Sequence, residues 1–333
     1  MRIMPVDPRT LAEDELTVLH DILTAVARHD HPDSPAPAKG DLEAKLARPW
    51  PRCRTACWLG FEDERAVGLA WVTLLADANS AVADLTLAVV PHERCQGAGR
   101  SLLREAVRLA YSTGRTTMIS EAADLEPAVD FAGSIGARPA LHEVHQVLQV
   151  PPVVAGLEAV PLGDYELVRL RDAAPPELRA GLGAVHEGMV DAPLGDTALA
   201  HQPYDGARVA AVDVTLQARG LVQLRVLARH LGTGEIVGVT YVIVSPRSPH
   251  RSEQGDTTVL PGHRGHRLGL AMKTEMLCWL GDEYPEVREL STWVARNNAP
   301  MLNVNERLGY RVVAHWTQWQ APVRELAGKL GLV

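Results

Sequence analysis

Hydrophobic and polar residues alternate with two periodicities along this chain, one typical of amphipathic helices and one typical of half-buried strands. Apolar residues at helical spacing, such as Leu16, Leu19 and Leu23, precede segments in which every second residue is apolar. Two of these segments are joined by the acidic turn 63–65, which predicts a β-hairpin. In the first half the pattern predicts strands over residues 2–7, 55–62, 66–75 and 82–90 and helices over residues 11–30 and 40–50.

The second half repeats the first. At an offset of 170 residues, residues 65–75 lie over 235–245 and residues 87–100 lie over 257–270, and further on the offset becomes 173. Such a long period indicates two copies of a whole domain, because solenoid repeats are about 20 to 50 residues long. The pattern predicts strands over residues 165–172, 224–231, 236–245 and 256–260 and a helix over residues 175–190. We therefore expect domains over residues 1–155 and 160–333, with the boundary in the Pro- and Gly-interrupted segment 151–163.

Composition excludes several classes of protein. The 333 residues are 46% hydrophobic and 22% charged, which provides for two cores and excludes a mainly disordered chain. Lys and Arg total 33 against 41 Asp and Glu, and no basic run follows a phosphate backbone, so nucleic acid is not an expected partner. The sequence shows neither a signal-peptide core nor a membrane span, so we expect a cytoplasmic protein without a membrane partner. Four cysteines at irregular spacing predict neither disulfides nor a zinc site, and no metal is expected.

Both halves contain a glycine-bearing loop between a strand that ends at a proline and a strongly periodic helix. The loops are Arg94-Cys-Gln-Gly-Ala-Gly-Arg100 and Arg264-Gly-His-Arg-Leu-Gly269. Glycines let backbone N–H groups approach a ligand, and the helix N-terminus adds about half a positive charge, so this arrangement favours a pyrophosphate. No Gly-Lys-Ser/Thr follows, and the loops come after a late strand of a mostly antiparallel run. A P-loop and a nicotinamide dinucleotide site are therefore both disfavoured.

The first loop resembles the Gln/Arg-x-x-Gly-x-Gly/Ala acyl-CoA signature of the GNAT superfamily of acetyltransferases. The second half resembles a branch of bacterial tandem GNAT proteins in the phrases that begin at Asp256 and Asn298. The resemblance implies an α/β (α+β) architecture of two tandem GNAT folds, each a mixed, mostly antiparallel twisted sheet flanked by helices. This layout is similar to that of mycothiol synthase, although no residue pattern assigns that enzyme's substrate.

The resemblance also implies acetyl-CoA as co-substrate and indicates which residues bind it. In the first half these are Val89, Arg94, Gly97, Ala98, Gly99, Arg100 and Ser101. In the second half they are Val259, Arg264, Gly265, His266, Arg267, Leu268, Gly269, Asn297 and Asn298. Each half also departs from the family pattern. Arg267 replaces the first glycine, at a position where a positive φ would be strained, and the first half lacks the Asn pair.

Acetyl transfer to an amine requires a base for the amine, a polarised thioester carbonyl and a proton for the departing thiolate. Family members often use a tyrosine as the acid, but Phe131 and Asn305 stand at that position here. As base we expect Asp256 or Glu253, both on the strand that leads into the second loop; the alternative for each is a solvated carboxylate. In the first half Asp84 is the nearest carboxylate, displaced by two positions. The C-terminal half is therefore the more promising catalyst.

The expected function is an acetyl-CoA-dependent N-acetyltransferase, an acyltransferase that acts by direct attack of a primary amine in a ternary complex. The alternative is a non-catalytic acyl-CoA-binding or interaction protein, because both halves lack the tyrosine. A small-molecule or peptide amine is the expected acceptor, and Glu187, Asp191 and Asp196 in a loop-rich segment are candidates to bind its positive charge. The protein is expected to be a monomer or a homodimer.

Overall fold

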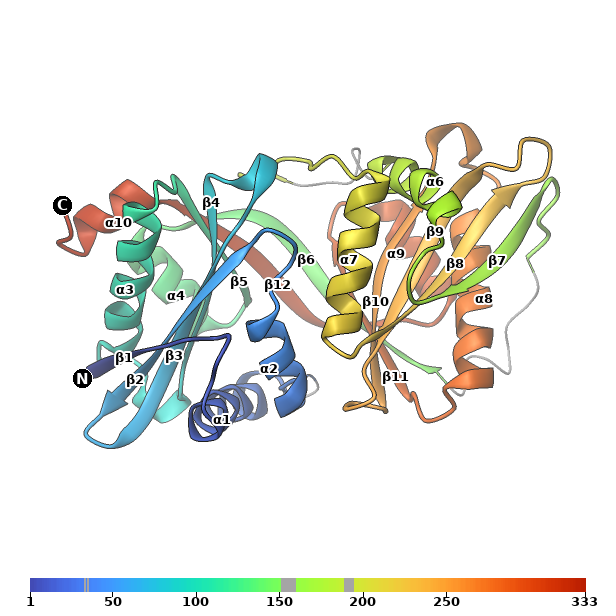
Figure 1. Cartoon of the computed structure of the whole chain (residues 1–333). Helices are drawn as coiled ribbons and strands as arrows, with labels where there is room; N and C mark the ends of the chain where they lie inside the picture. Colours follow the sequence, from blue (N-terminus) through green and yellow to red (C-terminus); the bar gives the residue numbers. More distant parts are fainter. Residues whose placement is uncertain (33, 35, 151–159, 189–194) are drawn as a thin grey trace. The chain divides into compact units, whose positions relative to one another are not determined.

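The computed structural model describes the chain except for residues 33, 35, 151–159 and 189–194. It forms two compact units, each built from non-contiguous segments (Figure 1). Unit 1 comprises Met1–Glu143, Leu194–Gln202 and His315–Val333, and unit 2 comprises Val144–Pro193 and Pro203–Ala314. The sequence predicted contiguous domains over 1–155 and 160–333 instead. Most of the predicted boundary segment lies outside the described residues.

The sheet of unit 1 has the strand order β1-β2-β3-β4-β5-β12. Neighbours run antiparallel except for the parallel pair β4 and β5. The strands are β1 (Arg2–Val6), β2 (Arg54–Glu62), β3 (Arg65–Leu74), β4 (Val82–Val89), β5 (Thr117–Ala123) and β12 (Arg311–Pro322). The helices are α1 (Glu13–Asp30), α2 (Lys39–Ala47), α3 (Ala98–Ser112), α4 (Glu126–Ile135) and α10 (Val323–Lys329), with short 3-10 turns η1 (Asp77–Asn79) and η2 (Pro91–Glu93).

Alternation along these strands gives the sheet two apolar faces, and each face carries its own core. Leu19 of α1 and Leu42 of α2 are buried on one face against Leu59. Leu102 of α3 is buried on the other face beside Val72. A layer of helices therefore covers each side of the sheet.

The last strand of unit 1 comes from the other half of the sequence. Residues 316–322 of β12 pair antiparallel with residues 117–123 of β5. The chain then enters α10, whose Val323 and Leu326 are fully buried in the core beside α3. This exchanged segment is the physical reason why unit 1 differs from the contiguous domain that the sequence predicted.

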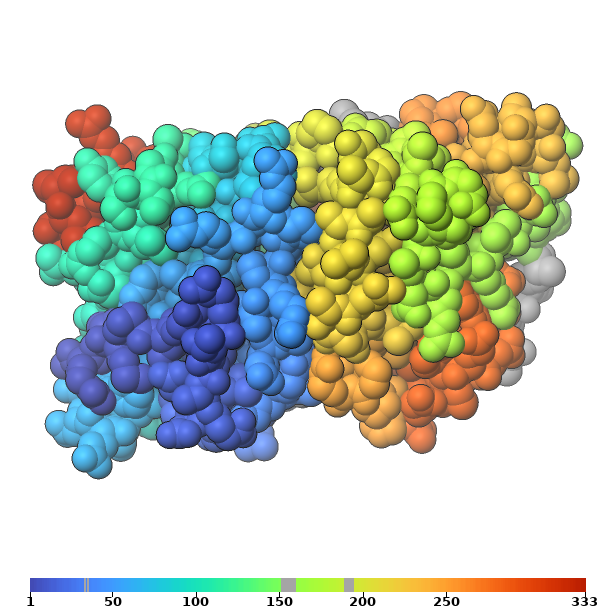
Figure 2. Space-filling model, in the orientation of Figure 1, coloured from blue at the N-terminus to red at the C-terminus, as the bar shows by residue number. Residues whose placement is uncertain are grey.

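The strands of unit 2 follow the matching order β6-β11-β10-β9-β8-β7, in which β6 comes from the first half of the chain. Helices α6 and α7 pack on one face, and their outer surfaces are visible in Figure 2 in yellow-green and yellow; α8 packs on the other face. The strands are β6 (Arg138–Gln149), β7 (Tyr165–Arg171), β8 (Val222–His230), β9 (Ile236–Val244), β10 (Arg251–Val259) and β11 (Glu289–Ala295). The helices are α6 (Pro176–Glu187), α7 (Gly206–Ala218), α8 (Leu268–Glu283) and α9 (Ala299–Arg307), with the 3-10 turn η4 (Pro261–His263).

The predicted fold class, two mixed and mostly antiparallel sheets flanked by helices, is confirmed. Two elements differ from the prediction. Strand β10 begins at Arg251, five residues before the predicted start, because its polar first residues are held by pairing with β9 and β11. Helix α7 follows a segment that we interpreted as loop-rich, and the Asp205 side chain caps it by accepting a bond from Arg208 N.

Candidate active site

In each unit two parallel strands separate after three residue pairs. Strand β4 pairs with β5 from Val82 to Asp84, and β10 pairs with β11 from Arg251 to Glu253. Both β4 and β10 continue for several residues beyond this point to their loops. Backbone groups along the separated edges are therefore available to an extended ligand.

The two loops share one backbone shape with two left-handed residues each. In the first loop Cys95 and Gly97 have φ values of 60° and 90°, and in the second Gly265 and Arg267 have φ values of 86° and 59°. Each loop thus has glycine at a different one of its two left-handed positions. Arg267 adopts the positive φ that the sequence analysis considered strained, as the N-cap residue of α8, at a cost of roughly 1 kcal/mol.

Both loops leave room for a ligand at a helix N-terminus. A Cβ added to Gly97 or to Gly265 would meet no atom within 4 Å. Buried Ala98 and Leu268 begin α3 and α8, so the unsatisfied N–H groups of the first turn of each helix lie at its loop. The remaining predicted residues here, Arg100 and His266, are exposed, and Ser101 bonds through its hydroxyl to the Gly97 carbonyl at 3.1 Å.

The first arginine of each loop is engaged with the protein itself. Arg94 Nε donates to the carbonyl of Val89 at 3.2 Å, and its guanidinium forms an ion pair with Asp30 at 2.5 Å. Arg264 Nε donates to the carbonyl of Val259 at 2.9 Å. These contacts hold each loop against the end of the preceding strand. In this structure Arg94 and Arg264 therefore bond to the protein's own groups.

Two other predicted positions have structural roles. Gly99 permits close packing of α4 on α3, because a Cβ there would lie 3.3 Å from Phe131 Cε2. Asn298 is the N-cap of α9, and its Oδ1 accepts a bond from Met301 N at 3.2 Å. Asn297 is exposed in the turn before it, and a Cβ on Gly269 would have its nearest neighbour at 3.8 Å, so both leave space for a ligand.

Strand β10 carries a bulge that β4 lacks. Its register with β9 shifts between Gln254 and Thr257, whereas β4 pairs with β3 without a shift. Residues three apart on a regular strand face opposite sides of the sheet. The bulge instead brings Glu253 and Asp256 to the same face, which is the face covered by α6 and α7. Gly255 is required within it because a Cβ there would collide with the Tyr241 ring.

The bulge also affects the correspondence between the halves. Glu253 pairs with Ser291 at the point where β10 and β11 separate, and Asp84 pairs with Ile119 at the same point in unit 1. Asp84 is therefore the counterpart of Glu253, and it lies two positions from the register of Asp256. Asp256 is an additional carboxylate of unit 2, introduced by the bulge.

Asp256 lies beside a cluster of aromatic side chains. Tyr241 donates a long hydrogen bond of 3.5 Å to Asp256 Oδ2, and the His186 ring lies 4.4 Å from the Tyr204 ring. Although Asp256 keeps an exposed edge, the surrounding protein displaces water and raises the pKa of its carboxyl, against the opposing effect of the Tyr241 hydrogen bond. Burial raises the pKa of Tyr241 well above its usual value and lowers the pKa of His186 to about 4. At neutral pH the tyrosine is protonated and the histidine is neutral.

An ion pair fixes the helix layer behind this cluster. Arg225 of β8 and Asp213 of α7 are 2% and 3% exposed and are hydrogen-bonded to each other. Asp213 also accepts a bond from Ala174 N at 2.8 Å. Because the carboxylate neutralises Arg225, this arginine does not offset the negative charge of Glu253 and Asp256.

Neither unit has an acidic proton donor at the position where the family often carries tyrosine. Phe131 packs on Gly99 and cannot donate a proton, and neither can the next residue, Ala132, which is the counterpart of Asn305 at the offset of 173 residues. Asn305 is 0% exposed, accepts a bond from Lys273 Nζ at 2.6 Å and donates one to Gln146 at 2.7 Å. The predicted absence of the usual acid thus coincides with a buried polar network in unit 2, which the sequence gave no reason to expect.

The two predicted acceptor carboxylates that the structure describes belong to different units. Glu187 belongs to unit 2 and accepts a bond from Tyr204 N, whereas Asp196 lies in unit 1, where its N–H donates to the carbonyl of Ala140 at 2.8 Å. Asp191 lies outside the described residues. The physical reason is that residues 195–202 pack on unit 1 and not on the unit that contains α6.

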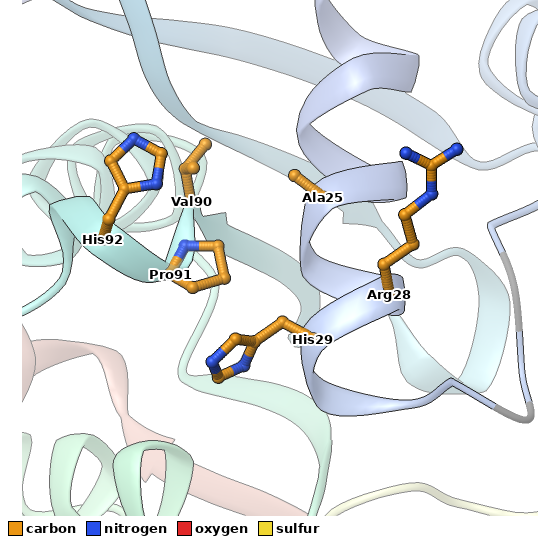
Figure 3. A pocket seen from close by; sticks show the side chains of 6 residues that line it. All are labelled: Ala25, Arg28, His29, Val90, Pro91 and His92. Carbon is orange, nitrogen blue, oxygen red and sulfur yellow. The ribbon is translucent and has the colours of Figure 1, made fainter.

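A pocket of about 550 Å³ lies between the C-terminal part of α1 and the turn after β4 (Figure 3). It is lined by Ala25, Arg28, His29, Val90, Pro91 and His92. The predicted cofactor and base residues are absent from this lining, so we assign it no ligand.

Within the described ranges no group of three or more His, Cys, Asp or Glu side chains is arranged to hold a metal ion. None of the helices in the described part of the chain has the length and apolar character of a transmembrane span.

Comparison with known proteins identifies relatives of this fold. Residues 17–137 match the acetyltransferase (GNAT) family. A tandem GNAT protein from the clavulanic acid biosynthesis pathway is 27% identical, with a TM-score of 0.81 over 97% of this chain and 98% of the other. A GCN5-related N-acetyltransferase from Sphaerobacter thermophilus is 15% identical, with a TM-score of 0.70 over 96% of both chains, which shows the fold alone. A search of curated proteins found no match.

The match covers most of unit 1, and the tandem relative covers both units at once. The repeated loops, the separated parallel strands and the repeated strand order agree with both findings. Residues 17–137 are thus a domain of the GNAT acetyltransferase family, and the chain as a whole has a tandem GNAT layout.

Proposed function

We propose that this protein is an acetyl-CoA-dependent N-acetyltransferase in which unit 2 transfers an acetyl group to a primary amine by direct attack in a ternary complex. The observation that carries the proposal is the bulge of β10. It presents two carboxylates, Glu253 and Asp256, on one face beside the separated strands and the loop at α8. Unit 1 has one of these carboxylates, Asp84, and no bulge.

The residues of unit 2 suit the removal of the amine proton, which is one of the proton transfers that this reaction needs. Acetyl-CoA supplies the thioester when bound along the edge of β10 with its pyrophosphate at residues 264–269. Asp256 accepts the proton of the attacking amine. Burial raises the pKa of its carboxyl and also that of Asp84, to about 6, so the bulge and not the pKa distinguishes the two units. Tyr241 holds Asp256 in place, and backbone N–H groups along the bulged strand face the oxygen on which charge develops.

The same face indicates a cationic acceptor. Glu253 and Asp256 contribute two negative charges, His186 is neutral, Arg225 is paired with Asp213, and the guanidinium of Arg208 lies 5.3 Å from the centre of the Tyr204 ring. An ammonium group is attracted to such a surface, whereas a substrate with a carboxylate next to its amine is repelled. We therefore propose a small-molecule or peptide amine without a neighbouring acidic group as acceptor.

The proposal is tested by replacing Asp256 with asparagine, which keeps the shape and removes the base. We expect kcat/KM for a reactive amine to fall about 10²- to 10⁴-fold between pH 6 and 9. Asp84→Asn is the matched control in unit 1 and is expected to leave turnover unchanged. Unchanged turnover in Asp256→Asn at all pH values refutes Asp256 as the base.

A second function is motivated by Phe131 and Asn305, which leave the usual acid position of both units without a proton donor. In this alternative the chain binds acyl-CoA and does not transfer the acyl group. Release of CoA thiol in the presence of a panel of amines separates the two functions. Tight binding of acetyl-CoA without release on any amine supports the binding protein and contradicts the transferase.

A further inference from the structure

Residues 195–202 lie on unit 1 as an irregular, extended segment held by side-chain amides. Gln320 accepts a bond from Ala198 N at 2.8 Å and donates one to the carbonyl of Asp196 at 2.8 Å. Asn79 makes the same pair of bonds with Ala200, accepting from its N–H at 2.7 Å and donating to its carbonyl at 3.1 Å. The bonds fall on alternate residues, as in a strand that is recognised through its backbone.

The amides that hold the segment are part of the folded interior. Asn79, Gln318 and Gln320 are 7%, 4% and 4% exposed. Gln318 accepts a bond from the Thr197 hydroxyl at 2.6 Å and donates one to Glu121 at 3.1 Å. These amides are buried with the segment in place, and its backbone and the Thr197 hydroxyl provide their hydrogen-bond partners.

This arrangement is not a general property of the repeated fold. At the offset of 173 residues, the positions in unit 2 that correspond to Gln318 and Gln320 are His145 and Val147. Val147 has no hydrogen-bonding group in its side chain, so unit 2 has no counterpart of the Gln320 amide, which both accepts and donates.

The segment covers the face of unit 1 that corresponds to the face of Asp256 in unit 2. Gln320 pairs with Ile119, and Ile119 pairs with Asp84, so these three residues form one row across the sheet. Gln318 occupies the neighbouring row with Glu121. An acceptor that approached Asp84 along this face would meet residues 195–202.

We propose that this face of unit 1 is a binding site for an extended polypeptide, filled by residues 195–202 of the same chain, and that the occupant closes the Asp84 face to an acetyl acceptor. Recognition through alternate backbone groups makes the site tolerant of side-chain identity. Because the occupant is tethered, its effective concentration is about millimolar and free peptides do not displace it. The peptide-binding site is independent of the proposed transferase function, whereas the closure of the Asp84 face to an acceptor rests on it.

The test releases residues 195–202 from the site and leaves the residues that line the site unchanged. Ala198→Pro with Ala200→Pro removes both donated N–H groups of the segment, and Ala198→Ser with Ala200→Ser is the matched control that keeps them. A fluorescent peptide with the sequence of residues 195–202 is expected to bind the proline variant at least tenfold more tightly than the wild type or the serine control. Adding Gln320→Glu, which keeps the shape but loses the donor, is expected to abolish this binding.

Hydrogen exchange of the wild type provides a second measurement. The amides of Ala198 and Ala200 are expected to exchange at least tenfold more slowly than in the free peptide. Failure of a folded proline variant to bind the peptide, or exchange of both amides at the free-peptide rate, overturns the proposal. Neither readout uses acetyl-CoA, so failure here is distinct from failure of the proposed transferase activity.

Discussion

Lys273 makes the stability of unit 2 depend on pH in an unusual direction. Its ammonium group is 2% exposed, donates to Asn305 and lies 4.7 Å from the centre of the Tyr310 ring, and neither partner carries a negative charge. Burial without a counter-ion lowers its pKa to about 7. In unit 1 the residue that corresponds to Lys273 is Leu103, and the residue that corresponds to Asn305 is Ala132. The free-energy cost of burying this ammonium group is therefore specific to unit 2.

The sign follows from which state binds more protons. Between pH 7 and about pH 10, the unfolded chain keeps Lys273 charged while the folded unit holds it neutral, so unfolding takes up a proton and stability rises with pH. The lowering from 10.5 to about 7 corresponds to about 5 kcal/mol across the whole range, or about 1.4 kcal/mol per pH unit near pH 9. Below pH 7 the lysine is charged in both states and the full cost of burying it is present.

The assay compares Lys273→Met with the wild type by urea unfolding at pH 7, 8, 9 and 10. Methionine removes the charge at similar length, so the advantage of the variant is expected to shrink by about 1.4 kcal/mol per pH unit between pH 8 and 10. Lys329→Met, which removes an exposed ammonium group, is the control and is expected to show no such trend. A constant difference between Lys273→Met and the wild type refutes the reasoning.

Three further predictions concern other parts of the structure. Arg267→Gly relieves the left-handed strain and is expected to raise the free energy of unfolding by about 1 kcal/mol in urea titrations, whereas an unchanged value contradicts strain at this position. Asn298→Ala removes the N-cap of α9 and is expected to lower stability by about 1 kcal/mol, with faster hydrogen exchange confined to that helix. Deletion of residues 315–333 is expected to unfold unit 1, so that limited proteolysis degrades β1 to β4 and spares unit 2; protection of β1 to β4 would contradict the role of β12.

Much of the fold was predictable because local patterns agree with the final structure. The hairpin of β2 and β3 follows from alternation around an acidic turn, and α1 follows from a helical stripe of leucines. The exchange of β6 and β12 was not predictable, because both strands carry the same repeated pattern and either one satisfies either sheet locally. Which sheet each strand joins is decided by tertiary packing, as in the burial of Val323 and Leu326 beside α3.

The two glycine-bearing loops of the candidate site could be predicted from the sequence. The strand register that brings Glu253 and Asp256 to one face could not. Glycines marked both loops, but the second left-handed residues, Cys95 and Arg267, have no sequence signal. Glu253 and Asp256 were proposed as alternative bases, and on a regular strand residues three apart face opposite sides. Their common face results from one bulge, and Gly255 is the residue in the sequence that is compatible with it.

The exchanged strand has a consequence for how the protein is made. Thr117 and Pro322 are paired across 205 positions of sequence (322 minus 117), and a ribosome that adds 5 to 20 residues per second takes roughly 10 to 40 s to cover that distance. Throughout this interval one edge of β5 has no partner strand, and exposed strand edges pair readily with other chains. Unit 1, although it is synthesised first, is completed last. The nascent chain therefore depends on chaperones, or on rapid completion, more than a protein with two contiguous domains does.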